Sequence, residues 1–318
     1  MPTGLFTHPA CLGHAPPAGH PERPERLEHV LKSLKNEEFQ MLVWAEAPLA
    51  PLAALSAAHA PALVEAILGP LATKAERDGF AQIDPDTIMS AGSAAAARRA
   101  AGAAIAVVDA IMAGTITNAF CAVRPPGHHA EHARAMGFCL FNNVAVAAKH
   151  AQNTHGIRRI AIVDFDVHHG NGTQDIFDDD ANVFYASTHQ APFYPGTGAA
   201  IETGCGNILN VPLAGGCTSQ TFRAAYADSV LPALVAFAPE MVFISAGFDG
   251  HAADPLAGFR LTAEDFVWVT DEICRVAARF AKGRVVSVLE GGYDLDALAA
   301  CVAAHVAALM NAAQMVQE

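Results

Sequence analysis

The sequence predicts one α/β domain in which a central, mainly parallel sheet is flanked by helices. Short apolar runs rich in β-branched residues alternate with longer helical stretches, an order typical of parallel strands joined by crossover helices. The 318 residues are 52% hydrophobic and only 16% charged, which is enough apolar material for one large core. No Ser/Gly/Pro-rich linker divides the chain, so a single domain over residues 1–318 is predicted.

The expected strands are mostly apolar, as strands covered on both faces of a parallel sheet are. Ile160–Phe165, for example, begins Ile-Ala-Ile-Val before its first charged residue. The full set of expected strands is Ala119–Val123, Ile160–Phe165, Val183–Ser187, Met241–Ser245 and Val285–Leu289.

The segments between these strands carry helical patterns. Thr262 is followed three residues later by Asp265, which is close to a capping box and predicts that a helix begins just after Thr262. Two segments rich in Pro and Gly, residues 8–24 and 192–198, are predicted to be surface loops. The expected helices are Ser90–Ala113, Asn143–Thr154, Ser219–Phe237, Ala263–Ala281 and Asp294–Asn311.

The composition argues against nucleic-acid and membrane partners and against a disulfide framework. The chain has 32 Asp and Glu residues against 19 Lys and Arg, which argues against a nucleic-acid partner because nucleic-acid-binding surfaces cluster basic residues. Apolar runs are interrupted before about 18 residues, so no membrane partner is expected. The seven cysteines form no CxxC pair and no signal peptide is visible, so a cytoplasmic location without a disulfide framework is expected.

Polar and ionisable side chains follow every expected strand. Ligands of open α/β sheets bind beyond the carboxyl ends of the strands, and packing alone would not place such groups at all of these ends. In strand order, the groups are His128 and His129, then Asp164, Asp166 and His168, then Ser187 and Thr188, then Asp249, and then Tyr293.

A divalent metal site is predicted at Asp166, His168 and Asp249. Asp166 and His168 are two residues apart, so in extended backbone their side chains point the same way. Asp249 is the best-placed third ligand. Two carboxylates and one imidazole leave a position open for water, as a catalytic zinc site requires.

His128 and His129 follow a Pro-Pro-Gly turn and are candidates for proton transfer. Asp164 is expected to orient one imidazole and Asn171 the other. A carboxylate favours the imidazolium form and an amide does not, so the two histidine pKa values should separate.

Three other residues suit an acyl substrate. Tyr293 follows Gly291-Gly292, where a tight turn brings its hydroxyl close enough to stabilise an oxyanion. Phe138 and Tyr194 are candidates for apolar walls around an aliphatic chain.

Taken together, these motifs resemble the zinc-dependent histone deacetylase superfamily, and are most similar to bacterial class II-like histone deacetylases and acetylamine amidohydrolases. The resemblance implies an arginase-like, single-domain α/β fold with a sheet of about eight strands. The motifs that carry it are Gly19–Leu27, Arg124–Ala130, Gly137–Asn143, Asp164–Thr173, Tyr194–Gly198, Ser245–Gly258 and Glu290–Tyr293.

The resemblance assigns roles to the site residues. It implies that Asp166, His168 and Asp249 hold Zn²⁺, that His129 is the general base and that His128 is its partner in proton transfer. It further implies that Asp164 pairs with His128, that Asn171 pairs with His129, and that Tyr293 binds the acyl carbonyl oxygen.

The resemblance also outlines a substrate channel. Phe138 and Tyr194 would line it, and the Gly137 carbonyl would accept the N–H of the scissile amide. Tyr194 stands where phenylalanine is commoner, so the channel is expected to be slightly more polar. Leu256 follows Asp254-Pro255, where polyamine-directed relatives can carry an acidic residue, and this favours an acyl-lysine substrate.

Other family positions match as well. Arg26 corresponds to an arginine beside an internal acetate-release cavity, and Asp86, or alternatively Asp84, to an aspartate at the channel rim. K⁺ or Na⁺ ions would be structural. Their first group is Asp164, Asp166, His168, Ser187 and Thr188, and a second lies around Phe177, Asp180 and Val183.

The expected activity is zinc-dependent hydrolysis of an N-acyl amide, releasing a free amine and a carboxylate from an acylated lysine peptide. The alternative is a small acylated amine such as an acetylpolyamine. A catalytically silent acyl-binding or scaffold module is disfavoured because each expected ligand and proton-transfer residue is present. The pattern leaves the oligomeric state open.

Overall fold

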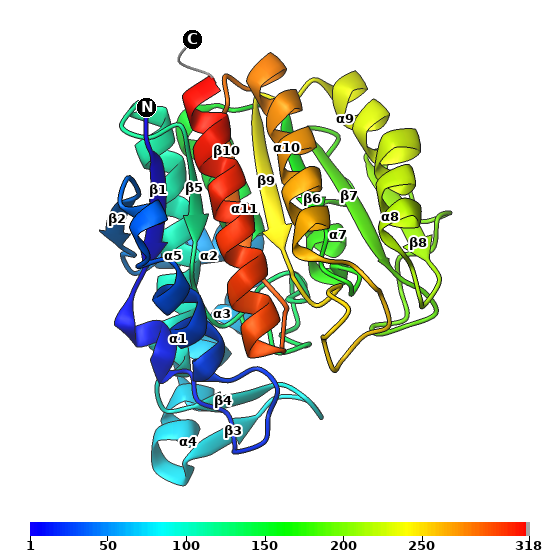
Figure 1. Ribbon diagram of the computed structural model, residues 1–318. Helices are drawn as coiled ribbons and strands as arrows, with labels where there is room; N and C mark the ends of the chain where they lie inside the picture. The colour runs from blue at the N-terminus through cyan, green and yellow to red at the C-terminus, as the bar shows by residue number, and fades with distance from the viewer. Residues whose placement is uncertain (316–318) are drawn as a thin grey trace.

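Eight parallel strands form the central sheet of the computed structural model, which describes residues 1–315 (Figure 1). Their order across the sheet is β2-β1-β5-β10-β9-β6-β7-β8. The strands are β1 (Thr3–Thr7), β2 (Val43–Glu46), β5 (Asn118–Cys121), β6 (Ile160–Asp164), β7 (Val183–Gln190), β8 (Ile208–Leu213), β9 (Met241–Ala246) and β10 (Val285–Leu289).

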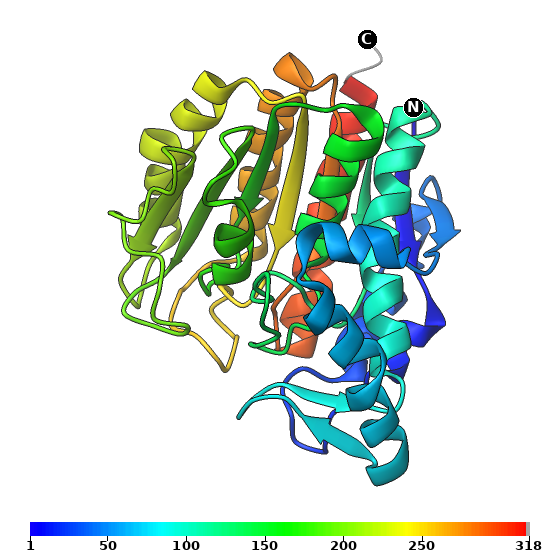
Figure 2. The ribbon, with the colours of Figure 1, turned by 180° about the vertical axis from the view of Figure 1, so that it is seen from behind.

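Helices cover both faces of this sheet. α10 (Ala263–Phe280) and α11 (Leu295–Met315) lie on one face (Figure 1), and α5 (Ser93–Met112) and α6 (Asn143–His155) lie on the other (Figure 2). The shorter helices are α1 (Pro24–Ser33), α2 (Leu52–Ala58), α3 (Pro61–Leu68), α4 (Pro70–Asp78), α7 (Asn171–Phe177), α8 (Ser219–Ala225) and α9 (Leu231–Phe237). The predicted parallel sheet flanked by helices is therefore confirmed.

The four central strands, β5, β10, β9 and β6, are buried at every residue. Strands covered on both faces must be apolar throughout, which explains why their sequences could be recognised without any alternation of polar residues. The carboxyl ends of these four neighbours all lie at the same edge of the sheet, because every pairing between them is parallel.

The five predicted strands are all present: Val285–Leu289 has the predicted ends, and the ends of the other four are shifted by one to three residues. β1, β2 and β8 were not predicted, and neither was a small antiparallel pair, β3 (Phe80–Gln82) with β4 (Ile88–Ser90). β2 is largely exposed, and β8 contains Pro212. Exposed edges and proline weaken the apolar signal of a strand, and proline is tolerated mainly at sheet edges.

The predicted start of α10 is confirmed, whereas the helix expected over Ser219–Phe237 is interrupted. The capping box is confirmed, since Thr262 N donates to Asp265 Oδ2 at 3.0 Å where α10 begins. The single helix expected over Ser219–Phe237 is instead interrupted by a π-helical turn, Tyr226–Val230, just before Pro232. Proline has no N–H to continue the regular hydrogen-bond ladder, which accounts for the break in register.

The prediction of a surface loop over residues 8–24 is wrong in part. The segment begins with a 3₁₀ helix, Pro9–Gly13, and buries the side chains of Cys11, His14 and Glu22. Glu22 accepts hydrogen bonds from the guanidinium groups of Arg26 and Arg124, at 2.9 and 2.5 Å. Pairing with two cations holds the pKa of this buried carboxyl below its usual value despite the opposing effect of burial.

α11, which corresponds to the helix expected over Asp294–Asn311, is long and apolar enough to cross a membrane by length and composition alone, whereas the sequence analysis expected no membrane partner. It packs against α10, α1 and β5, and His305 within it is fully buried, bonded to Thr270 and Ser287. Core helices of folded domains show the same length and composition, so this is weak evidence for a membrane span.

Candidate active site

The four central strands deliver one functional segment each to a single rim. The loop after β5 carries His128 and His129, and the loop after β6 carries Asp166 and His168. Asp249 follows β9 and Tyr293 follows β10. Segments that are far apart in sequence therefore meet because their strands are neighbours in the sheet.

The three predicted metal ligands converge. His168 Nδ1 lies 3.1 Å from Asp166 Oδ1 and 3.1 Å from Asp249 Oδ2. Both carboxylates are fully buried, and the ligand atoms all lie within 4.8 Å of one another. The free oxygens are oriented by the backbone, because Gly291 N donates to Asp166 Oδ2 at 2.8 Å and Val167 N donates to Asp249 Oδ1 at 2.9 Å.

This donor set fits a divalent cation. One hydrogen on His168 Nδ1 cannot serve two carboxylates equally, whereas a cation would take all three atoms as ligands. Burial and the nearby charge of Asp166 raise the pKa of Asp249. The two carboxylates raise the pKa of His168 to about 10 although burial opposes it. Both shifts show that the two carboxylates attract positive charge, which a bound Zn²⁺ would supply in place of the His168 proton.

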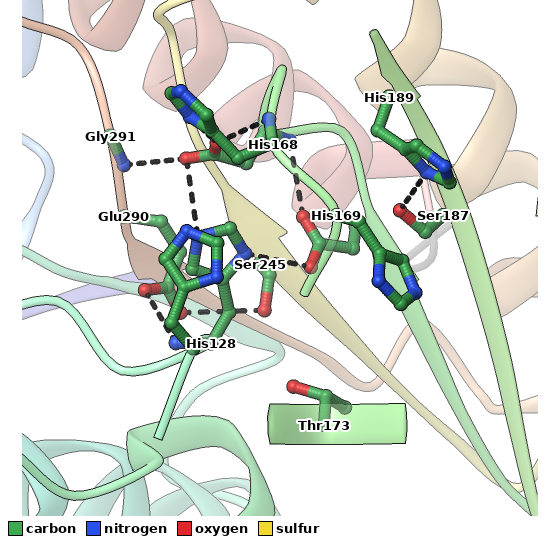
Figure 3. A network of polar contacts seen from close by, with 12 residues as sticks. His128, His168, His169, Thr173, Ser187, His189, Ser245, Glu290 and Gly291 are labelled. Carbon is green, nitrogen blue, oxygen red and sulfur yellow. Dashed lines mark hydrogen bonds and ion pairs between the residues drawn. The ribbon is translucent and has the colours of Figure 1, made fainter. Parts of the chain in front are cut away.

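Two glycines make room for the carboxylates. A Cβ atom at Gly291 would overlap the Oδ2 atoms of Asp249 and Asp166, and one at Gly247 would overlap Asp166. Glycine is therefore required at both positions by close approach of backbone to ligand, rather than by a turn. Figure 3 shows Gly291 beside the polar network that His128, His168 and Glu290 form.

His128 is bound to carboxylates on two sides. Its Nδ1 donates to Asp164 Oδ2 at 3.0 Å, and its Nε2 lies 3.8 Å from Asp166 Oδ2. Although burial disfavours the charged imidazole, these carboxylates raise the pKa of His128 to about 10. Glu290 Oε2 accepts hydrogen bonds from Gly127 N and His128 N, at 2.6 and 3.1 Å, and so fixes the loop (Figure 3).

His129 has the opposite electrostatic environment. Burial, and then the positive charges of His128 and His168, hold the pKa of His129 well below its usual value. Its Nδ1 lies 2.8 Å from Asn171 Oδ1, and Asn171 Nδ2 donates to Glu131 Oε1 at 2.7 Å. Glu131 thereby orients the Asn171 amide with its oxygen toward Nδ1, which places the proton on Nδ1 and leaves Nε2 free to accept one.

Contacts of both the backbone and the ring fix the position of Tyr293. Its N–H donates to Asp254 Oδ2 at 2.7 Å, and the Arg26 guanidinium carbon lies 4.8 Å from the ring centroid. Arg26 also donates to the carbonyl oxygens of Gly292 and Glu290, at 2.6 and 2.5 Å. Burial raises the pKa of the Tyr293 phenol, although Arg26 opposes this, so the hydroxyl keeps its proton as a donor.

Aromatic rings lie beside His129, His168 and Tyr293. The Tyr194 ring lies 5.2 Å from the His129 ring, and the Phe138 ring lies 6.0 Å from the Tyr293 ring. Phe193, which sequence reasoning missed, stacks on His168 with ring centroids 5.3 Å apart. At Gly137, where φ is +58°, a Cβ atom would lie 2.5 Å from the His129 ring, so a side chain is excluded there.

The structure separates the two rim aspartates. Asp84 Oδ1 accepts the N–H groups of Asp86 and Thr87 and so closes its own turn. Asp86 Oδ1 accepts from Thr87 Oγ1 at 3.0 Å, and Thr87 Oγ1 in turn accepts from Phe138 N at 3.1 Å. Asp86 is therefore the aspartate linked to the channel segment. Leu256 is half-buried, and its N–H donates to Asp254 Oδ1.

The residues of the first predicted monovalent-cation group lie on β6, on β7 and in the loop after β6. Asp164 is paired with Ser187 in the sheet register, and Thr188 follows Ser187. The loop bearing Asp166 and His168 is tied to the same strand by the hydrogen bond from Gln190 N to Val167 O. The hydroxyl groups of Ser187 and Thr188 contact His189 and Tyr226, and the cation site stays a prediction.

The second predicted cation group is arranged differently from the expectation. The carbonyl oxygens of Phe177, Asp180 and Val183 do converge, but Asn207 Nδ2 donates to all three, at 2.7, 3.2 and 2.8 Å. The side-chain amide of this chain thus occupies the centre of the three carbonyls. A cation at this position would have to displace the Asn207 amide.

Comparison with known proteins agrees with this geometry. The model of the family described as "Histone deacetylase domain" matches residues 20–309. The chain belongs to the histone deacetylase family. A solved structure, the HD domain of HDA15, has a TM-score of 0.91 and 35% sequence identity, covering 99% of this chain and 92% of that one.

Relatives of this histone deacetylase family member include the Type-2 histone deacetylase 2 of Dictyostelium discoideum, 37% identical over 96% of this chain and 20% of the relative. A "Probable deacetylase" of Archaeoglobus fulgidus is 37% identical over 93% of this chain and 82% of the relative. The chain spans about half or less of the length of the first curated relatives it matches.

Several residues in and around the candidate site were not assigned a role from the sequence. They are Glu131, Phe193, Asn207, Asp254 and Glu290. Glu290 was visible only as part of the Glu-Gly-Gly-Tyr motif, and it is fully buried with a pKa that burial raises to about 7. Each of the five acts through a contact between distant segments, for which the sequence offers no spacing signal.

Proposed function

We propose that this protein is a zinc-dependent amidohydrolase that removes an acetyl or similar acyl group from a lysine side chain. The convergence of His168 Nδ1 with the carboxylates of Asp166 and Asp249, on the same rim as His129 and Tyr293, is the observation that carries this proposal. Family membership supports deacetylase chemistry.

Asp166, His168 and Asp249 would hold the zinc ion, which when bound lowers the pKa of a water molecule and polarises the acyl carbonyl. His129, neutral at its free Nε2, takes the proton of the attacking water. Asp164 holds His128 as an imidazolium beside His129. His128 is the partner that returns a proton to the departing amine. Each imidazole is thereby assigned the protonation state that its neighbours favour.

The remaining residues bind and orient the substrate. Tyr293 donates its phenol hydrogen to the carbonyl oxygen as negative charge develops there. Phe138 and Tyr194 enclose the aliphatic chain, and the Gly137 carbonyl accepts the amide N–H. Arg26, held by Glu22 on the inner side of Tyr293, is positioned to attract the acetate product.

The proposal is tested by measuring acetate release from an acetyl-lysine peptide, with the protein stripped by a chelator and then reloaded with Zn²⁺. Activity should disappear on stripping and return with zinc. A stripped protein that retains full activity would contradict the role of the metal. Lack of hydrolysis by zinc-loaded protein on a broad acyl panel would favour the silent acyl-binding alternative.

The alternative substrate is an acetylpolyamine. Leu256 lacks the charge that a cationic chain would favour, so we expect higher kcat/KM on the peptide than on acetylspermidine. Leu256→Glu should raise kcat/KM on acetylspermidine relative to the peptide by up to about fivefold, because an exposed charge pair contributes up to about 1 kcal/mol. Leu256→Gln, which is polar but uncharged, is the control. Equal effects of Glu and Gln would remove charge as the cause.

The pH dependence of kcat/KM tests the assignment of His129 as the base. Because its pKa is lowered, the neutral form persists below pH 6.5, and the acid limb of the profile should lie there. Placing a carboxylate at residue 171 favours the imidazolium form and should move this limb upward by about one to two pH units.

The double variant Glu131→Gln/Asn171→Asp makes this test without placing two carboxylates in contact. The glutamine amide introduced at residue 131 can donate to the new carboxylate, whereas the original Glu131 would repel it across the 2.7 Å contact. Glu131→Gln alone is the matched control and should leave the acid limb in place. If the double variant titrates like the wild type, His129 is not the group that limits the rate at low pH.

A further inference from the structure

A second group of metal-ligating side chains lies on the helical layer formed by α5 and α6. Asp109 belongs to α5, and His150 and His155 belong to α6. The Nε2 atoms of both histidines lie 2.7 Å from the same oxygen, Asp109 Oδ1. Their rings are 5.5 Å apart and nearly perpendicular, with an interplanar angle of 80°.

The backbone holds this arrangement in place. α5 and α6 pack against each other along the face seen in Figure 2. His155 is the last residue of α6, and Gly156 ends the helix in the left-handed conformation, with φ +66° and its N–H bonded to Ala151 O and Gln152 O. His150 and His155, about one and a half turns apart on α6, thus reach the same carboxylate from its last turns.

The chemistry of the group is that of a transition-metal site. The Asp109 carboxylate meets both imidazoles through a single oxygen, Oδ1. Two imidazole nitrogens and one carboxylate oxygen suit Zn²⁺, Ni²⁺, Co²⁺ or Cu²⁺ rather than Mg²⁺ or Ca²⁺. The His150 and His155 side chains are 16% and 22% exposed and that of Asp109 50% exposed, so an ion can enter from solvent and keep water as its remaining ligand.

An orienting partner is also present. Thr154 Oγ1 lies 3.2 Å from His150 Nδ1. When Nε2 binds a metal, the hydrogen of a neutral imidazole moves to Nδ1, and this hydroxyl is then its acceptor. The same three side chains can instead form a metal-free hydrogen-bonded group, in which each Nε2–H donates to Asp109, and an experiment has to separate these two states.

We propose that Asp109, His150 and His155 form a binding site for a transition-metal ion of the Zn²⁺ class, separate from the catalytic centre. It lies at the end of α6 opposite to Asn143, about 18 Å away along the helix axis. Asn142, which caps the other end of α6, bonds to Ala130 O and Thr173 beside the active-site histidines. A metal here would fasten α5 to α6 and so stabilise the helix layer that supports the site.

The test compares bound zinc in the wild type with that in His150→Gln/His155→Gln. Each protein is stripped by a chelator, dialysed against micromolar Zn²⁺, and its bound metal counted. His29→Gln, on α1 and outside both clusters, is the control. We expect the double variant to bind one ion fewer per chain than the wild type and the control, with kcat/KM on the acetyl-lysine peptide unchanged. The difference in bound ions does not depend on whether the catalytic centre itself binds zinc.

Thermal unfolding gives a second readout. Saturating Ni²⁺ should raise the Tm of the wild type by several degrees more than that of the double variant, because a ligand bound only to the native state stabilises it. Equal metal counts in wild type and double variant, or extra zinc in the wild type only at millimolar concentration, would show that the three side chains are merely hydrogen-bonded and would overturn the proposal.

Discussion

Asp249→Asn is expected to lower kcat/KM on an acetyl-lysine peptide by about a thousandfold and to abolish tight zinc binding at the catalytic centre. Asparagine keeps the volume of the side chain and can still accept the hydrogen bond from Val167 N. It removes one of the two carboxylates that hold the metal, and Lewis-acid activation contributes several kcal/mol at about tenfold in rate for each 1.36 kcal/mol.

The fold should survive this substitution. Asp249 and Asp166 are buried side by side, and burial together with their mutual repulsion raises the pKa of Asp249. Replacing one carboxylate by a neutral amide relieves that repulsion, so the metal-free variant should unfold at a Tm no lower than that of the metal-free wild type. Asp271→Asn on α10, which changes the net charge equally, is the matched control. Normal zinc content and normal turnover in Asp249→Asn would refute the ligand assignment.

Tyr293→Phe is the second large effect. Loss of one donor to a developing oxyanion lowers kcat by about a hundred- to a thousandfold, with little change in KM. The buried phenol ring should stay in place, because Arg26 contacts its face and Asp254 holds its N–H. Bound zinc should be unchanged, which separates this variant from Asp249→Asn.

The chain offers its own control for Tyr293→Phe. Tyr194→Phe deletes the same atom from a ring that is 36% exposed at the channel wall, and it should change kcat by no more than a few-fold. If both tyrosine variants lost activity equally, or if Tyr293→Phe kept wild-type kcat, the Tyr293 hydroxyl would not be the oxyanion donor.

The parts of the fold that the sequence predicts well are those with a local signal. The predicted strand Val285–Leu289 has the observed ends, because a strand buried on both faces is apolar from end to end and is bounded by polar residues. β2 was missed because two of its residues, Val43 and Trp44, are exposed at the edge of the sheet. An exposed edge strand is defined by its hydrogen bonds to a distant neighbour, and its own composition reveals little.

In the candidate site, too, only the residues with a local sequence signal could be predicted. Asp166 and His168 could be named from their spacing at a strand end, and the structure brings Asp249 to them. Glu131 and Asn207 could not be identified, because each acts on a group that only the folded chain brings near: the Asn171 amide in one case and three backbone carbonyls in the other. Asp86 could be chosen over Asp84 only once the hydrogen bonds of the turn were visible.

The strand order has a consequence for how the chain folds while the ribosome synthesises it. Of the strands in this sheet, β9 and β10 are made last, yet they fill its middle, between β5 and β6. A nascent chain that has reached only residue 240 therefore has a two-strand gap at its centre, with two apolar strands facing it. Until that gap closes, the unfinished polypeptide exposes the unpaired apolar edges of β5 and β6. We therefore expect it to bind chaperones.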